Sequence, residues 1–337
     1  MNFSHHEQTP VPEHDFAPFI RILGKGKKGS RPLSQDEAYC AMQMILAGQV
    51  EPEQLGAFLM LMRIKEETPQ ELAGFVFAAK ETFTFANSHV DLDWSSYAGK
   101  RRHLPWFLLA ALLLANNGIT VFMHGSEGHT AGRVYTQDVL KYLNLIPAQS
   151  IEQAKQQLIS QQFSYLSLEQ FCPTLHHIIE LRPLLGLRSP VHTLVRLLNP
   201  FNAAYSIQGI FHPSYRPVHQ QAAALLNQAH MAVLKGEGGE TERNPDMECL
   251  VQSVHEGQLI DELWPALFNL RHVKDEQLNP QRLLTVWQGI EIDEFAIGSV
   301  IGTTAIALKL LGKVTNQQDA QQLATKYWEA RDKQRFN

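Results

Sequence analysis

Apolar side chains recur at helical spacing through the first eighty residues of the chain. Ser34 and Glu37 form a capping-box pattern, in which each side chain accepts a hydrogen bond from the backbone N–H of the other residue. The segment 68–71 repeats this pattern with proline at the first helical position, and Glu51 with the proline after it opens another helix. The pattern therefore predicts a small all-helical unit.

The periodicity changes from about Trp94, where short apolar runs begin to alternate with helical segments. The run 104–116 predicts a buried helix, because its apolar part is shorter than the roughly 20 residues that a membrane span requires. Apolar runs at 119–123, 205–211 and 231–234 predict short buried strands. Helices interleaved with buried strands indicate an α/β domain, and no membrane partner is expected.

The segment 188–200 predicts a helix with two distinct faces. Ser189 and Pro190 are a suitable N-cap and first-turn pair. His192 and Arg196 are four residues apart and share one face. The other face carries Leu187, Val191, Leu194 and Leu198. We expect the apolar face to pack and the opposite face to present cations.

The composition is that of a globular protein in a reducing compartment. The chain has 337 residues, of which 44% are apolar and 19% charged, and this length allows two compact domains. The first fourteen residues lack the apolar core of a signal peptide. Cys40, Cys172 and Cys249 are far apart and form no C-x-x-C pair, so we expect reduced core thiols in a cytoplasmic protein.

The net charge of −5 disfavours a polyanionic partner, but the distribution of the charges reverses this impression. Acidic residues collect between Glu237 and Glu294, whereas three segments contain only cations. Those cations are Arg21, Lys25, Lys27, Lys28 and Arg31, then Lys100, Arg101 and Arg102, then Arg182, Arg188, Arg196, Arg216 and Lys235. If the segments converge, they form a positive groove that attracts a polyanion. The alternative is three unrelated solvated patches.

Several motifs suggest small-molecule or metal chemistry only weakly. Glycine-bearing loops at 124–132 and 236–239 follow strands and could cradle phosphate, but neither matches a dinucleotide or Walker fingerprint. The segment 24–30 lacks the Gly-Lys-Ser/Thr order of a P-loop. His124, Glu127 and His129 lack metal-site spacing, so loop histidines without a metal are the favoured interpretation.

Two long stretches resemble the anthranilate phosphoribosyltransferase family (glycosyltransferase family 3). The first is 182–213, where an Arg-x-x-Leu-Gly-x-Arg run leads through a helix to Asn-Pro and a short strand. The second is 47–75, which is similar to the family's helical domain. The resemblance implies a small all-helical domain hinged to a larger α/β domain, and usually a homodimer through the helices.

This two-domain fold gives a prediction for the division of the chain. We expect residues 1–90 to form the helical domain, with 174–200 packing on it. Residues 91–173 and 201–337 would then form the α/β domain.

The family's catalytic motifs are degenerate in this chain. The family enzymes transfer ribose 5-phosphate from phosphoribosyl pyrophosphate to an amine, and a Gly-Thr-Gly-Gly-Asp loop wraps the pyrophosphate. The corresponding stretch here is 95–101, Ser-Ser-Tyr-Ala-Gly-Lys-Arg. The side chain of Tyr97 would keep the backbone of this loop from approaching a phosphate closely. The family's Lys-His-Gly-Asn becomes Met-His-Gly-Ser at 123–126, and its Asp-Glu magnesium pair becomes Thr241-Glu242. We therefore expect that the parent reaction is lost.

The departures are similar to the YbiB-like branch of the family, whose members keep the fold and bind nucleic acid without marked sequence preference. The resemblance thus implies DNA or RNA as partner and no cofactor. The groove would be lined by Arg21, Lys25, Lys27, Lys28, Arg31, Lys100, Arg101, Arg102, Arg182, Arg188 and Arg196. Residues 100–102 would act as cationic arms that reach the polymer's backbone. Tyr97 could stack on unpaired bases, whereas Trp106 is expected in the core.

A working phosphoribosyltransferase with an altered acceptor is the alternative. In that case Glu242 would hold Mg²⁺, and His124 with Gly125 would contact the acceptor or phosphate. Arg182 falls at the family's substrate-contacting arginine and would keep that role.

Overall fold

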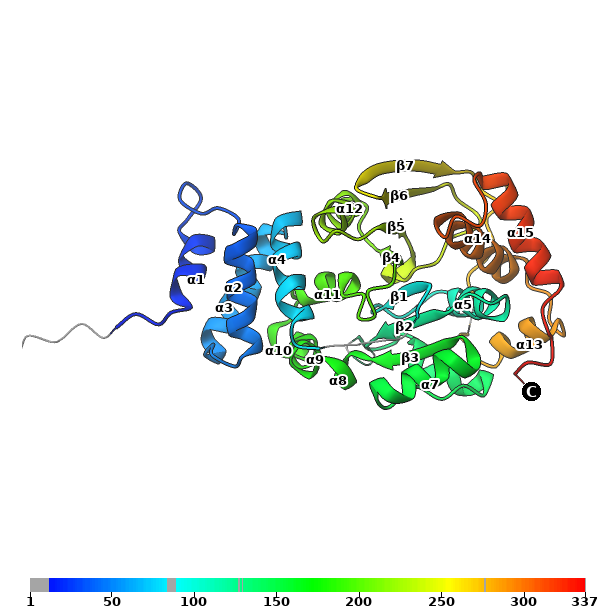
Figure 1. Ribbon diagram of the computed structural model, residues 1–337, viewed down its shortest axis with the longest axis horizontal. Helices are drawn as coiled ribbons and strands as arrows, with labels where there is room; N and C mark the ends of the chain where they lie inside the picture. The colour runs from blue at the N-terminus through cyan, green and yellow to red at the C-terminus, as the bar shows by residue number, and fades with distance from the viewer. Residues whose placement is uncertain (1–11, 84–88, 127, 129, 276, 337) are drawn as a thin grey trace, which may run out of the picture.

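The computed structural model describes residues 12–83, 89–126, 128, 130–275 and 277–336. A small helical unit lies at one end of the molecule and a larger α/β part at the other (Figure 1). The helical unit consists of α1 (Ala17–Gly24), α2 (Gln35–Leu46), α3 (Pro52–Lys65) and α4 (Pro69–Lys80). The helices expected in this region are therefore confirmed.

The predicted caps fix where α2 and α4 begin. The Ser34 hydroxyl accepts from the backbone N–H of Glu37, and the Glu37 carboxylate accepts in return from the Ser34 N–H. In α4 the Glu71 carboxylate accepts from the backbone N–H of Thr68 at 2.8 Å and also from that of Leu33 at 2.8 Å. One glutamate thus caps its own helix and holds the start of its neighbour, because a capping carboxylate has two acceptor oxygens.

A seven-stranded sheet organises the α/β part, with strand order β3-β2-β1-β4-β5-β6-β7. The first five strands of this order run parallel, and β6 and β7 form an antiparallel hairpin at the edge. The strands are β1 (Leu92–Ser96), β2 (Val121–Gly125), β3 (Phe163–Ser167), β4 (Tyr205–Ile210), β5 (His230–Lys235), β6 (Cys249–His255) and β7 (Gln258–Trp264). Strands are thus found at the three predicted runs, while the other four were not predicted.

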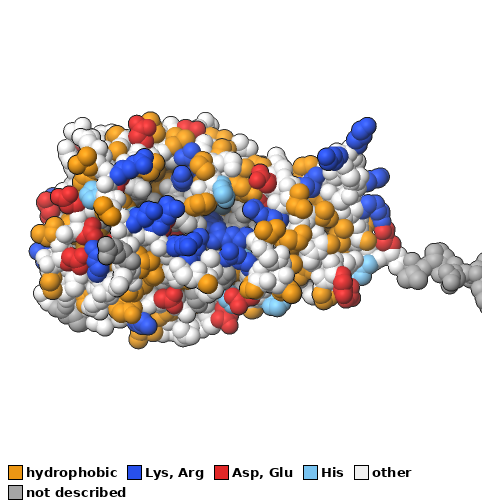
Figure 2. Space-filling view, turned by 180° about the vertical axis from the view of Figure 1, so that it is seen from behind, with side chains coloured by type: hydrophobic (Ala, Val, Ile, Leu, Met, Phe, Trp, Pro, Cys, Tyr) orange, Lys and Arg blue, Asp and Glu red, His pale blue; other side chains and the backbone are white. Residues whose placement is uncertain are grey.

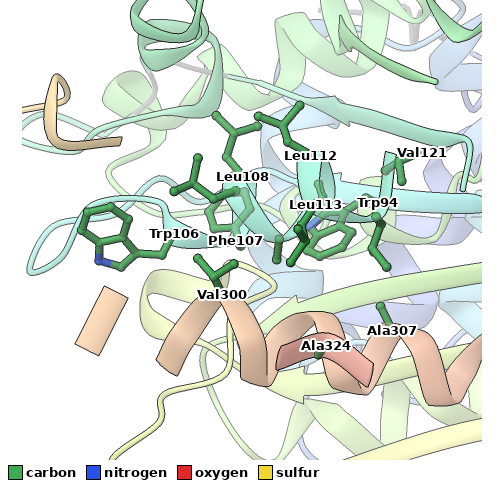
Figure 3. Packing of buried hydrophobic residues seen from close by; sticks show 14 of the residues in the cluster. Trp94, Trp106, Phe107, Leu108, Leu112, Leu113, Val121, Val300, Ala307 and Ala324 are labelled. Carbon is green, nitrogen blue, oxygen red and sulfur yellow. The ribbon is translucent and has the colours of Figure 1, made fainter. Parts of the chain in front are cut away.

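Helices cover both faces of this sheet and create two apolar cores. On one face α5 (Trp106–Asn116), confirmed as a buried helix, packs against α14 (Glu294–Leu310) (Figure 3). The remaining helices of this layer are α6 (Thr136–Leu140), α13 (Arg282–Gln288) and α15 (Gln317–Glu329). Trp94 of β1 and Met123 of β2 point into this core. Trp106 is buried in it, as expected.

The opposite face of the sheet joins the helical unit. Phe122 of β2 and Leu166 of β3 belong to a second core that also contains Leu72 and Phe75 of α4. Short helices between sheet and helical unit complete this layer (Figure 1): α8 (Leu168–Phe171), α9 (Pro173–Glu180), α10 (Arg182–Leu185) and α11 (Val191–Leu194). The layer also includes α7 (Ile151–Gln161) and α12 (Tyr215–Leu225). Strands covered on both faces are expected for a parallel sheet.

The two-faced helix predicted at 188–200 is wrong. Pro190 is the N-cap, α11 is only four residues long, and a 3₁₀ turn continues it over Val195–Leu197. Both His192 and Arg196 are buried, because this segment lies between the sheet and the helices and has no open face. Leu187, which we expected on the packed apolar face, is instead 51% exposed.

All three cysteines are free thiols, but only two lie in the core. Cys172 and Cys249 are buried as expected, whereas Cys40 is exposed on α2. Burial raises the pKa of the Cys249 thiol to about 11. In the part of the chain that the structure describes, none of the helices has both the length and the apolarity to cross a membrane.

Candidate nucleic-acid interface

A cavity of about 970 Å³ lies where β1, β4 and β5 end. Its walls come from the loops that follow these strands, from the segment before β6, and from the segment 271–274. The carboxyl edge of a parallel sheet is the usual place for a ligand in α/β proteins, since loops from several strands converge there. The position of the cavity therefore makes it the first candidate for a binding site.

Among the charged side chains that line this cavity, Lys and Arg outnumber Asp and Glu by eight to four, and Glu248 is the exposed carboxylate among them. Asp246 bonds His272 at 2.7 Å, and Glu237 and Glu242 are both paired with Lys100. The exposed cations of the cavity form no ion pair within the described residues; we call Arg101, Arg102, Lys235, Arg271 and Lys274 the cavity cations. Figure 2 shows Lys and Arg side chains across the middle of one face of the molecule. Their charge is therefore available to a ligand.

A second group of arginines adjoins the cavity through Arg133, which lines it. Burial and, after it, the positive charges of Arg196, Arg133 and Arg182 together lower the pKa of the half-buried Arg188 to about 10. Such mutual effects require that the charges lie close together. The structure thus brings Arg133 together with the arginines of the segment 182–196. Arg182 also donates a hydrogen bond to the Thr130 hydroxyl.

Arg196 belongs to this group by charge but cannot contact a ligand directly. Its Nε donates to the carbonyl of Gly209 at 3.0 Å, and its guanidinium also donates to the carbonyl of His192. The side chain is buried and bonds the backbone of both α11 and β4. The expectation that Arg196 lines the groove is therefore wrong, because its donors are directed at internal carbonyl groups.

The amino-terminal cations lie away from the cavity. Arg21 pairs with Glu13, and Arg31 pairs with Glu37 at 2.6 Å. The exposed Lys25, Lys27 and Lys28 follow α1 at the far end of the helical unit, and none of these five cations lines the cavity (Figures 1 and 2). The prediction of one groove that includes them is wrong, because α2 to α4 stand between them and the sheet.

Lys100 is 1% exposed, so it does not reach out as the cationic arm that we expected. Its ammonium lies 3.1 Å from Glu237 and also bonds Glu242. Burial disfavours the charged ammonium, but the two carboxylates outweigh this effect and raise the pKa of Lys100. Lys100 therefore remains charged and is neutralised internally.

Backbone N–H groups of the loop after β1 are bound by two glutamates of the loop after β5. One oxygen of Glu240 accepts from the N–H groups of Ala98 and Gly99, both at 2.6 Å. One oxygen of Glu237 accepts from the N–H groups of Arg101 at 3.1 Å and Arg102 at 2.6 Å. By resemblance, this loop stands where the family has its pyrophosphate-binding loop. In this chain, the carboxylates of Glu237 and Glu240 accept the hydrogen bonds that its N–H groups could donate to a phosphate.

The residues expected to serve a transferase do not fit that role here. Glu242 uses one oxygen for Lys100 and the other for the N–H of Phe107 at 2.8 Å, so Mg²⁺ would have to compete with both partners. The Thr241 hydroxyl donates to the carbonyl of Ser95 at 3.3 Å. No cluster of three or more metal-binding side chains exists among the described residues. Glu127 and His129 lie outside them.

The His-Gly pair at 124–125, which still matches the family motif, is also inaccessible to a substrate. His124 is fully buried, with its ring nitrogens 2.7 Å from the Tyr97 hydroxyl and 3.3 Å from the Asp93 carboxylate. A side chain at Gly125 would approach the carbonyl oxygen of Ser96 to 2.1 Å, so packing of β1 requires this glycine. Tyr97 is buried too, and the stacking role expected for it is wrong.

Sequence reasoning missed several residues of the interface. Arg133 lies in a loop with no other cation nearby in the sequence. Arg271 and Lys274 lie in the acid-rich segment, so a count of charges along the chain does not single them out. Arg216 and Lys235 stood out as cations but were not assigned to the site. Arg216 donates to the carbonyl of Leu250 at 3.0 Å while lining the cavity.

Comparisons with known proteins agree with this architecture. The chain is 31% identical to an uncharacterized protein of Aquifex aeolicus over 76% of this chain and 79% of that protein. It is 31% identical to the uncharacterized protein YbiB of Escherichia coli over 60% of this chain and 64% of that protein. An anthranilate phosphoribosyltransferase of Geobacillus is 25% identical over 91% of this chain and 92% of its own length.

A solved structure shows the same fold. Anthranilate phosphoribosyltransferase from Thermus thermophilus superposes with a TM-score of 0.78 over 94% of both chains, at 22% sequence identity. The helical bundle domain of the glycosyl transferase family matches residues 17–82, and the family's α/β domain matches residues 107–329. This chain therefore belongs to glycosyl transferase family 3, whose anthranilate phosphoribosyltransferases it resembles in fold.

Proposed function

We propose that this protein binds nucleic acid, largely independently of sequence, on the scaffold of a phosphoribosyltransferase. The observation that carries the proposal is the group of five cavity cations, which are exposed and form no ion pair with any residue that the structure describes, in a chain of net charge −5. Exposed like charges repel one another, so a surface that gathers them is costly unless a polyanion neutralises them.

The extent of the positive surface supports a polymer rather than a small anion. Arg133 connects the cavity cations to Arg182 and Arg188, which lie beyond the cavity. A nucleic-acid strand carries one negative charge per roughly 3.4 Å, so such a surface can meet several phosphates of one strand. Phosphate contacts carry no sequence information, which explains the expected lack of specificity.

An exposed aromatic ring at the cavity supports the same partner. Phe211 is 50% exposed and lines the cavity together with His212. Stacking of bases on aromatic rings tolerates every base, because each base has a π-face. DNA and RNA both meet these requirements. Homodimer formation, cytoplasmic localisation and the absence of a cofactor remain predictions.

A salt titration of binding tests the proposal. Fluorescence anisotropy with a labelled single-stranded oligonucleotide gives the dissociation constant at several salt concentrations. Six phosphate contacts predict a slope of about −4 for log affinity against log salt, or a loss of roughly 300-fold between 50 and 200 mM salt. A slope near zero would contradict the proposal.

Two matched variants locate the contacts. Replacing Arg101, Arg102, Arg271 and Lys274 by Ala should reduce the slope by about 3 and weaken all sequences alike. Replacing Lys25, Lys27 and Lys28 by Ala removes a comparable charge at the far end of the helical unit. We expect a clearly smaller effect from this control. Equal effects of the two variants would show that overall charge, not the cavity, determines binding.

Phosphoribosyl transfer to another acceptor is the second candidate, favoured by similarity to anthranilate phosphoribosyltransferases over nearly the whole chain. The engaged oxygens of Glu242 and the buried His124 argue against it. Incubation with Mg²⁺, phosphoribosyl pyrophosphate and a panel of amines would reveal it through release of pyrophosphate. Release above the protein-free rate would favour this candidate over nucleic-acid binding alone.

A further inference from the structure

The loop after β1 presents an anion-binding arrangement of backbone donors at the wall of the cavity. The N–H groups of Ala98, Gly99, Arg101 and Arg102 are all directed at carboxylate oxygens. Gly99 has a φ of 65°, in the left-handed region that favours glycine. Successive backbone N–H groups around such a residue form a concave nest that binds oxyanions.

Both occupants of this nest come from the protein itself. Glu237 and Glu240 lie in the short loop after β5, and each places a single oxygen between two N–H groups. Glu240 is 1% exposed, so its carboxylate lies deep in the nest. Hydrogen bonds from N–H groups to a charged oxygen are stronger than those between neutral groups, which keeps both side chains in place.

We propose that Glu237 and Glu240 determine the ligand class of this protein by filling a phosphate-binding nest with internal carboxylates. A free phosphate or diphosphate cannot reach the four N–H groups while the carboxylates hold them. Ligand anions are left with the side-chain cations of the surface, which suit separate phosphates along a polymer. The preference for a polymer rests on the proposed function, whereas the occupancy of the nest does not.

Glu237 controls the part of the nest that opens to the cavity. Its side chain is 21% exposed and lines the cavity, and its second oxygen lies 3.1 Å from the Lys100 ammonium. Its removal would leave two N–H groups and one buried ammonium facing the cavity. That combination of backbone donors and a lysine charge is suited to an inorganic phosphate or pyrophosphate.

Titration calorimetry with inorganic pyrophosphate tests the inference. We expect E237A to bind pyrophosphate about tenfold or more tightly than E248A. Glu248 is an exposed residue of the same cavity and forms no ion pair or hydrogen bond with other described residues. E248A therefore removes an equal charge without freeing an N–H group. E237Q should gain much less than E237A, because its amide oxygen can still accept from the nest.

Hydrogen exchange of the backbone amides of Arg101 and Arg102, which donate to Glu237, provides a readout at the nest itself. In E237A these amides should exchange faster, and pyrophosphate should slow them again. In the unaltered protein pyrophosphate should leave their exchange unchanged, a result that needs no variant to fold. The inference is overturned if E237A, E237Q and E248A gain affinity equally, or if pyrophosphate protects these amides in the unaltered protein. Either result would leave the salt-dependent binding of nucleic acid unaffected.

Discussion

Lys100→Met should destabilise the protein strongly. The ammonium of Lys100 is buried between Glu237 and Glu242, and methionine fills a similar volume without the charge. The substitution would leave Glu242 buried without its partner. Breaking a buried ion pair in this way costs about 3–5 kcal/mol, because the remaining charge is desolvated and uncompensated. At about 2–4 °C per kcal/mol, the thermal midpoint should fall by roughly 6–20 °C.

The loss should also depend on pH through Glu242. Burial raises the pKa of its carboxyl, and without Lys100 the opposing attraction disappears. A carboxyl with a folded-state pKa above its unfolded value binds its proton more tightly in the folded state. Stability is then lost as the pH rises from the unfolded value, near 4.5, through the raised folded value. The defect of Lys100→Met should therefore be smaller at pH 5 than at pH 8.

Differential scanning calorimetry at the two pH values measures both effects. Arg101→Met is the matched control, since the neighbouring arginine is exposed and its loss should change the midpoint by a degree or two at most. The double variant Lys100→Met with Glu242→Gln should recover part of the loss, because no buried charge remains unpaired. A Lys100→Met protein as stable as the control would refute the assignment of a buried ion pair.

Further predictions concern packing and protonation. Gly74→Ala should destabilise by about 1–3 kcal/mol, since a Cβ there would lie 2.2 Å from the Gln35 carbonyl oxygen. A Cβ added at Gly56 in α3 has no neighbour within 4 Å, so Gly56→Ala should be neutral or stabilising. Urea titration of both glycine variants measures the two effects. Burial lowers the pKa of His219 to about 3, so stability should fall as the pH drops from 6.5 toward 3. His219→Gln should flatten this slope; an unchanged slope would contradict the assignment.

The helical unit could be predicted closely because its signals are local. Ser34 and Glu71 satisfy backbone donors a few residues away, so the sequence alone contains both partners of each cap. The missed strand β1 shows the opposite case. Asp93 is buried beside His124 of the neighbouring strand, and a polar residue in a strand is tolerated only when such a partner exists. That partner lies 31 residues away in the chain and could not be assigned from the local pattern.

The sequence by itself determined the α/β class and the caps of the first helices, because both depend on residue types at fixed spacing, and its resemblance to the family showed that the catalytic motifs have changed. Only the tertiary structure decided which cations are available to a ligand. Lys100 and Arg196 are buried and cannot contact a ligand. Arg271 and Lys274 line the cavity, although they lie in an acid-rich stretch of the sequence. The reason is physical: the field of a charge depends on its distance to other charges and its exposure to water, and neither is written in sequence order.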